Sequence, residues 1–176
     1  MYKMESKNDQ SANLPYYYPE LYVSTSQVAG RGLFSKSKLP AGTILFKLEG
    51  KLIHHDYGPE FAELGPNWVG IGYKKWIVLD ENEEAMFLNH CCSPNVMVNP
   101  NQEIVALKVI HANDELLLDY STTELDPYWT MQCNCRSRKC RQVIKSFQYL
   151  PYRLQLKYKP YIADVFWNMS KPEHKY

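Results

Sequence analysis

Short runs of alternating apolar and polar residues, separated by glycine and proline, fill most of the chain between residues 20 and 121. Such runs are typical of short β-strands joined by turns. Single strands are expected over 20–26, 32–37, 43–53 and 115–121, and hairpins over 67–80 and 96–110, with turns over 30–32 and 39–42. The pattern therefore predicts a mostly-β domain built from many short strands.

A helical period governs the end of the chain. Leu150, Leu154 and Tyr158 recur at helical spacing, and Ile162 and Phe166 continue it. Pro160 stands between the two sets, and proline interrupts a helix interior. Two short helices are therefore expected here, and one more helical turn is expected over 59–65.

Composition is that of an ordinary globular protein, with 45% hydrophobic and 22% charged residues in 176. That length suits one domain with its own core. The formal net charge is +1, so no bulk field favours nucleic acid or an anionic membrane. The polar N-terminus lacks the apolar segment of a signal peptide, and no run approaches a membrane span. We therefore expect an intracellular protein, in the cytoplasm or nucleus, with no direct nucleic-acid binding.

The five cysteines fall into two groups. Cys91 and Cys92 are adjacent, whereas Cys133, Cys135 and Cys140 form a C-x-C-x4-C pattern. A structural zinc site takes four ligands, so three local thiolates need one more from elsewhere in the fold. Spacing alone leaves Cys91 and Cys92 open for that role. A disulfide framework is disfavoured by the odd cysteine count and by the expected reducing compartment.

Four segments, in order along the chain, resemble the motifs of SET-domain protein lysine methyltransferases. They read AGRGLFS at 29–35, FLNHCCSPN at 87–95, DELLLDYS at 114–121 and CNCRSRKC at 133–140. The last resembles the post-SET zinc motif of this family. The resemblance spans about two thirds of the chain. It implies a SET-domain fold of several small sheets, with a zinc-bound post-SET segment and a short α-helical tail.

The resemblance also implies boundaries along the chain. A flexible segment over 1–13 would precede a SET domain over 14–124. A post-SET zinc segment over 125–145 and a helical tail over 146–176 would follow.

By the same resemblance, the cofactor is S-adenosylmethionine and one structural zinc ion is bound. The zinc ligands would be Cys92, Cys133, Cys135 and Cys140, with Cys91 as a small buried residue beside them. The cofactor-binding residues would be Gly30, Arg31, Gly32, Asn89, His90 and Tyr120. The glycines would let the backbone approach the methionine end of the cofactor, and Asn89 and His90 would hold its adenine.

Tyr120 is the expected catalytic residue. Methyl transfer to lysine is an in-line displacement that needs a neutral, desolvated and aligned amine, and alignment alone can contribute about 7–11 kcal/mol. A phenol in a narrow site can orient that amine, whereas Asp119 is interpreted only as a polar group at the end of a strand. The expected partner is a protein that carries a target lysine, a histone or another basic protein.

Several residues depart from the family pattern or allow a second interpretation. Met86 stands where many members carry arginine, and either Trp68 or Tyr73 would supply an upstream aromatic contact to the cofactor. Four basic residues near the last cysteines would either contact nucleic-acid phosphate or form a solvated loop: Arg136, Arg138, Lys139 and Arg141. An acidic cluster would either attract a basic substrate or form a solvated acidic turn; it consists of Asp80, Glu81, Glu83 and Glu84. The alternative function is a catalytically weak SET-fold zinc protein that binds peptide or nucleic acid.

Overall fold

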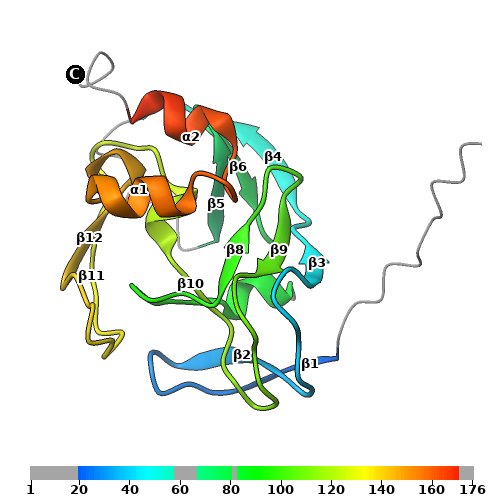
Figure 1. Ribbon diagram of the computed structural model, residues 1–176. Helices are drawn as coiled ribbons and strands as arrows, with labels where there is room; N and C mark the ends of the chain where they lie inside the picture. Colours follow the sequence, from blue (N-terminus) through cyan, green and yellow to red (C-terminus); the bar gives the residue numbers. More distant parts are fainter. Residues whose placement is uncertain (1–19, 58–66, 81–82, 171–176) are drawn as a thin grey trace, which may run out of the picture.

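The structure is a computed structural model that describes residues 20–57, 67–80 and 83–170 (Figure 1). In these residues the strands form four small sheets, and two helices follow near the C-terminus. This confirms the predicted mostly-β architecture. The expected flexible segment over 1–13 and the helical turn over 59–65 lie outside the described residues. None of the described helices has the length and apolar character needed to cross a membrane.

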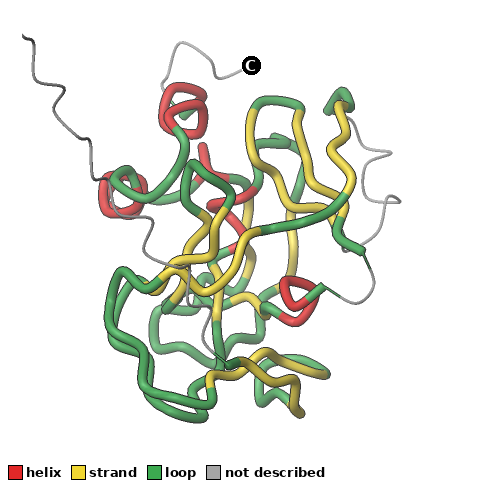
Figure 2. The backbone as a smooth tube through the Cα atoms, turned by 90° about the vertical axis from the view of Figure 1, so that its right-hand side faces the viewer, coloured by secondary structure: helices red, strands yellow, loops and turns green. Residues whose placement is uncertain are grey.

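The first sheet is an antiparallel pair of β1 (Leu21–Thr25) and β2 (Arg31–Ser35). Only Arg31 at the start of β2 is exposed, whereas Leu33 and Ser35 have no exposed surface and anchor the pair to the core. Gly30 adopts a positive φ of 48° at the turn before β2. Figures 1 and 2 place this sheet at the end of the molecule opposite the two helices.

The central sheet has five strands in the order β3-β9-β8-β10-β7. Its members are β3 (Ile44–Lys47), β9 (Glu103–Ala106), β8 (Val96–Val98), β10 (Leu117–Leu118) and β7 (Asn89–His90). The predicted hairpin over 96–110 forms as β8 and β9. β10 runs parallel to both β7 and β8, and the predicted strand over 115–121 is reduced to these two residues.

A third sheet contains β4 (Lys51–His54), β6 (Lys75–Val78) and β5 (Trp68–Gly72) in that order. The predicted hairpin over 67–80 is confirmed, and Lys74 takes a positive φ of 53° at its bend. The single strand expected over 43–53 is wrong, because the segment divides into β3 and β4. Gly50 lies at the division with a φ of 150°, and a side chain there would overlap the backbone of Val78.

The cysteine-rich segment is bracketed by a two-stranded sheet that the sequence did not predict. Its strands are β11 (Thr130–Gln132) and β12 (Val143–Lys145), paired antiparallel. Ile144 is the inward-facing member, with 1% of its surface exposed. Short 3-10 helices precede β7, follow β10 and follow β12: Glu84–Phe87, Tyr120–Thr123 and Phe147–Tyr149.

The two expected helices form as α1 (Tyr152–Tyr158) and α2 (Asp164–Met169), with Pro160 between them. Tyr158, Ile162 and Phe166 are buried in the main core. Burial of each such side chain contributes about 1.5–3 kcal/mol. Because isolated helices this short are unstable in water, this packing holds them in place.

Candidate functional site

Three of the sequence motifs meet at one edge of the central sheet. β7 carries Asn89 and His90, which pair in register with Leu117 and Leu118 of β10. Tyr120 follows two residues after Leu118, so the parallel pairing brings it beside His90. Their ring centroids lie 5.3 Å apart.

The Asn89 side chain joins this edge to the glycine-containing turn. Its Nδ2 donates to the carbonyl oxygens of Ala29 at 3.1 Å and Arg31 at 3.0 Å, and to Glu115 Oε1 at 2.8 Å. Ser26 Oγ donates to the same Glu115 oxygen at 2.7 Å. Glu115 is therefore a structural residue of the site that had not been singled out, although it lies within the DELLLDYS segment.

The close approach of Glu115 explains why residue 32 is glycine. A Cβ atom at Gly32 would overlap the Glu115 carboxylate. Arg31 extends from the same turn, and its guanidinium lies 4.5 Å from the centroid of the Phe87 ring, a cation–π contact. The structure thus places Gly30, Arg31 and Gly32 beside the segment that contains Asn89.

Tyr120 is fixed at both its backbone and its hydroxyl. Its backbone N–H donates to His90 Nδ1 at 3.2 Å, and its hydroxyl donates to the Leu88 carbonyl oxygen at 2.6 Å. Burial raises the pKa of the Tyr120 phenol to about 12, and Glu115 adds to the effect. The phenol is therefore neutral at physiological pH and acts as an oriented dipole and not as a base.

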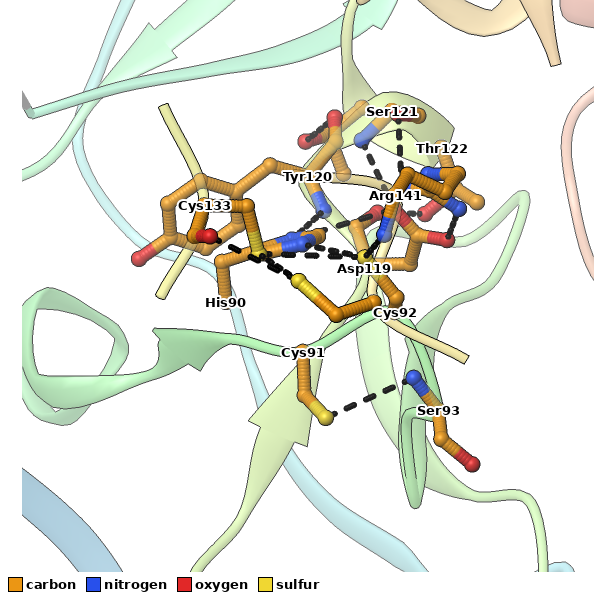
Figure 3. Close-up of polar contacts among 12 residues, drawn as sticks. His90, Cys91, Cys92, Ser93, Asp119, Tyr120, Ser121, Thr122, Cys133 and Arg141 are labelled. Carbon is orange, nitrogen blue, oxygen red and sulfur yellow. Dashed lines mark hydrogen bonds and ion pairs between the residues drawn. The ribbon is translucent and has the colours of Figure 1, made fainter. Parts of the chain in front are cut away.

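The hydrogen bonds of His90 determine its tautomer. Burial lowers the pKa of His90 to about 4, so the ring is neutral and carries one proton. Because Nδ1 accepts from Tyr120, the proton resides on Nε2, which lies 3.3 Å from Cys92 Sγ. His90 therefore connects the backbone of Tyr120 to a cysteine sulfur (Figure 3).

Three cysteine sulfurs gather next to His90, and a fourth, that of Cys140, lies beside Cys133. Cys92 Sγ lies 3.8 Å from Cys133 Sγ, and Cys140 Sγ lies 3.6 Å from the same atom. Side-chain contacts also link Cys135 to Cys133 and Cys140. The ligand atoms of His90, Cys92, Cys133 and Cys135 all lie within 4.8 Å of one another. The cysteine cluster can therefore hold a metal ion, and all five cysteines are free thiols.

Backbone N–H groups point at these sulfurs. Arg141 N–H donates to Cys92 Sγ at 3.3 Å, and Gln142 N–H donates to Cys140 Sγ at 3.4 Å. Burial opposes ionisation of Cys135, but backbone hydrogen bonds from Cys92 and other donors lower its pKa to about 7. Burial raises the pKa of Cys92 and Cys133 despite such donors. The donors therefore favour the thiolate, the form that binds metal, at Cys135.

Cys91 is oriented differently from its neighbour. Its side chain points away from the Cys92–Cys133 pair, and its sulfur accepts from Ser93 N–H at 3.4 Å (Figure 3). It is buried, with 5% of its surface exposed, and it also contacts Cys135. The His90 ring contacts Cys92 and not Cys91.

A buried ion pair links Tyr120's neighbour to the cysteine-rich segment. Asp119 is fully buried, and the Arg141 guanidinium donates to its two oxygens at 2.7 and 2.6 Å. Tyr158 of α1 contributes a further side-chain hydrogen bond to Asp119. Arg141 is therefore no part of a solvated loop, and Asp119 is more than a strand-end polar group. Arg136, Arg138 and Lys139 are exposed, as the solvated-loop interpretation expected.

A cavity of about 230 Å³ opens beside Tyr120. Its wall combines apolar side chains, among them Leu88 and Leu118, with three tryptophans, Trp68, Trp76 and Trp129. Trp68 thus lines the cavity next to Tyr120, whereas Tyr73 is not part of that wall and is 41% exposed. Trp129, just before the cysteine-rich segment, was not predicted as a site residue, and no spacing signal marks it.

Among the described residues, one acidic side chain, Glu124, lines the wall. Its Oε1 accepts from the backbone N–H groups of Leu125 at 2.8 Å and Asp126 at 2.7 Å. Burial raises the pKa of Glu124 to about 7, although these hydrogen bonds and one from Trp76 oppose the shift. The cavity is therefore an aromatic space with a carboxyl group that titrates close to neutral pH.

Comparison with known proteins agrees with this geometry. Residues 30–121 match the SET domain family. The chain is 29% identical over 140 residues to human Histone-lysine N-methyltransferase 2B, covering 69% of this chain and 5% of that protein. It is 28% identical over 137 residues to Histone-lysine N-methyltransferase trithorax of Drosophila melanogaster, and the match covers 69% of this chain and 4% of that protein. It is 28% identical over 135 residues to Histone-lysine N-methyltransferase set1 of Dictyostelium discoideum, and the match covers 68% of this chain and 9% of that protein.

The chain thus spans less than a tenth of the length of these relatives. The matched region includes the glycine-containing turn, the Asn89–His90 pair and the segment that ends at Tyr120. The family match covers more than half of the chain and contains the edge at which these motifs meet. The protein therefore belongs to the SET domain family.

Proposed function

We propose that this protein is an S-adenosylmethionine-dependent methyltransferase that modifies a lysine side chain of a protein substrate. The observation that carries the proposal is the convergence of Asn89, His90 and Tyr120 beside an aromatic cavity. The relatives' names as histone-lysine N-methyltransferases support the same reaction class.

The residues at the sheet edge suit the cofactor. Gly30 leaves the turn open to a bound molecule, Gly32 makes room for the Glu115 carboxylate, and Asn89 fixes the turn through two backbone carbonyls. The neutral His90 and Tyr120 suit a cofactor that carries a positive sulfonium, because neither adds a competing positive charge. When bound, the cofactor would supply an activated methyl group.

Tyr120 would position the acceptor amine. Its hydroxyl and the Leu88 carbonyl oxygen lie 2.6 Å apart at the cavity wall, so two oxygens concentrate partial negative charge there. Such fixed dipoles favour the positively charged methyl-transfer region. The neighbouring apolar wall would desolvate the lysine side chain, which must react as a neutral amine.

We propose that Cys92, Cys133, Cys135 and Cys140 hold one structural zinc ion. A tetrahedron with zinc–sulfur bonds of about 2.3 Å has sulfur–sulfur edges of about 3.8 Å. The 3.6 and 3.8 Å separations around Cys133 are consistent with that figure. Histidine ligation is disfavoured, because a metal on His90 Nε2 would place the ring proton on Nδ1, against the Tyr120 N–H donor.

We propose further that the substrate is basic around its target lysine. Burial and the charges of Glu49, Glu84 and Asp80 raise the pKa of Glu83, so these four acidic side chains lie near one another. Glu83 and Glu84 directly precede the cavity-lining residue Ala85 in the chain. Glu81, the other member of the expected cluster, lies outside the described residues. Replacing Asp80, Glu83 and Glu84 with their amides should raise KM for a basic peptide and flatten its salt dependence. An unchanged KM and salt profile would remove this cluster from substrate selection.

A methyl-transfer assay with Tyr120→Phe tests the main proposal. The variant loses the hydroxyl bonded to Leu88 but keeps the ring volume, so the fold should persist. We expect turnover on a lysine-containing basic protein to fall strongly, while cofactor affinity stays within about tenfold, or 1.4 kcal/mol. Tyr149→Phe is the matched control, because Tyr149 is 49% exposed and outside the cavity wall. Parental turnover by Tyr120→Phe would refute the assignment.

The alternative is a SET-fold protein that binds without turnover. Calorimetry with S-adenosylmethionine separates the two functions. Binding combined with absence of label transfer to any lysate protein would favour the alternative. Binding together with labelling of a lysine, located by mass spectrometry, would support the enzyme.

A further inference from the structure

Charge is divided unevenly along this chain. Residues 127–163 contain eight Lys or Arg and no Asp or Glu, whereas residues 20–126 contain eight Lys or Arg and fifteen Asp or Glu. The formal net charge of +1 therefore averages over two regions of opposite sign. The expectation that nucleic acid does not bind rested on that average.

Seven of the eight cations in this segment are exposed; the eighth, Arg141, is paired with Asp119. The seven are Arg136, Arg138, Lys139, Lys145, Arg153, Lys157 and Lys159. None of them forms an ion pair with a carboxylate of the described ranges 20–57, 67–80 and 83–170. We call these seven side chains, with the exposed rings between them, the basic face.

The elements that contain the basic face follow one another along the chain. The loop between β11 and β12, the end of β12 and α1 follow one side of the molecule (Figure 1). Gln155 of α1 donates to the carbonyl oxygen of Leu150 at 2.8 Å and to that of Phe147 at 3.4 Å. These bonds hold α1 against the segment that follows β12.

Exposed aromatic rings alternate with the cations. Tyr149 is 49% exposed, and Lys145 Nζ lies 5.5 Å from its ring centroid. Tyr152 is 66% exposed, and its ring centroid lies 6.2 Å from that of Trp167. Lys159 Nζ lies 4.5 Å from the Trp167 ring centroid. Cations would attract any polyanion, but exposed rings next to cations offer a stacking surface that carboxylates cannot use. Unpaired bases can stack there.

We infer that the basic face binds single-stranded nucleic acid, with cations on the phosphates and bases stacked on Tyr149 and Tyr152. Neither these two tyrosines nor the seven cations line the cavity beside Tyr120. The inference is therefore independent of methyl transfer. It adds a nucleic-acid surface to a chain whose acidic residues lie mainly before residue 127.

Fluorescence anisotropy with a labelled single strand of about 16 nucleotides, across a salt series, tests the electrostatic part. Each phosphate contact contributes a slope of about −0.7 to log K against log salt. The triple variant Arg153→Gln, Lys157→Gln, Lys159→Gln should bind at least tenfold more weakly at low salt. Its slope should be shallower by about 2, since three contacts are lost.

A matched variant removes the same charge elsewhere. Lys47, Lys51 and Lys108 are exposed and lie outside the basic face. Their replacement by glutamine should leave the slope within about 0.7 of the parent value. An equal loss of single-strand affinity in the two triple variants would overturn the inference. Absence of binding by the parent protein at low salt would overturn it too. Thermal unfolding of all variants confirms that each is folded.

Tyr152→Ser tests stacking separately from charge. It should weaken single-strand binding by about fivefold or more, and it should leave binding of a duplex of the same sequence unchanged. Unchanged single-strand affinity would refute stacking at this position and with it the preference for single strands. Displacement of the oligonucleotide by polyglutamate at equal charge concentration would assign the face to an acidic polypeptide and overturn the inference.

Discussion

Replacing Arg141 with methionine should destabilise the protein through Asp119. The Arg141 guanidinium makes two short hydrogen bonds to a carboxylate that has no exposed surface, while its own side chain is 16% exposed. Methionine fills a similar apolar volume but offers no donors. Asp119 would then remain buried beside Tyr120 with its main counter-charge removed.

The expected cost follows from that geometry. Removing one partner of a buried ion pair typically costs about 3–5 kcal/mol, because the remaining charge is desolvated without compensation. For a chain of this size, each kcal/mol shifts Tm by about 2–4 °C, so Tm should fall by about 6–20 °C. The matched control is Lys36→Met, since Lys36 and Glu20 form a 3.5 Å pair with 52% and 73% exposed side chains. Such an exposed pair contributes about 0–1 kcal/mol.

Urea unfolding of four proteins measures the effect: the parent, Arg141→Met, Asp119→Asn and the double variant. Asn cannot carry the charge, so the double variant should lose less stability than the two single variants combined. A coupling free energy below about 0.5 kcal/mol would refute the reasoning, as would an Arg141→Met cost equal to that of Lys36→Met. Zinc content must be measured in each sample, because Arg141 N–H also donates to Cys92 Sγ.

Two other predictions concern metal and pH. Cys140→Ser should reduce the zinc content well below one equivalent by elemental analysis, whereas Cys91→Ser should retain it; the reverse order would refute the ligand assignment. Glu124 has a folded-state pKa of about 7 against an ordinary value of 4.5, so the folded state binds more protons between these values. The extra bound proton stabilises the folded state, and this contribution to the free energy of unfolding is complete below about pH 4.5. It is lost as pH rises through 7, and the total loss is up to about 3 kcal/mol. Glu124→Gln, which stays neutral, should not show that loss in urea unfolding, and parallel pH profiles would contradict the prediction.

The local pattern of apolar and polar residues was sufficient to predict much of the fold. The hairpin over 67–80 was predictable because two apolar runs flank a polar pair, and Lys74 occupies its bend. The two helices were predictable from the spacing of apolar residues around Pro160. In both cases the signal lies within about 20 residues and depends on one buried face.

Features that depend on distant contacts were missed. β11 and β12 have three residues each, too few to show alternation, and their pairing depends on the cysteine-rich segment between them. The sequence also gave no reason to choose Arg141 over the other basic residues of its segment. Only the fold, which brings residues 22 apart in sequence together, selects it as the partner of Asp119.

The fold also explains why the cysteine-rich segment bears on the catalytic proposal. Two connections run from the cysteine cluster to Tyr120 and its neighbour Asp119: His90 links Cys92 to the Tyr120 backbone, and Arg141, next to Cys140, holds Asp119. One connection is a neutral hydrogen-bonded ring and the other is an ion pair, so they differ in their sensitivity to salt and pH. Because both end at adjacent residues, their effects on Tyr120 should be coupled and not additive. A metal ion that orders the sulfurs would therefore also order the hydroxyl at the cavity wall, without contacting substrate.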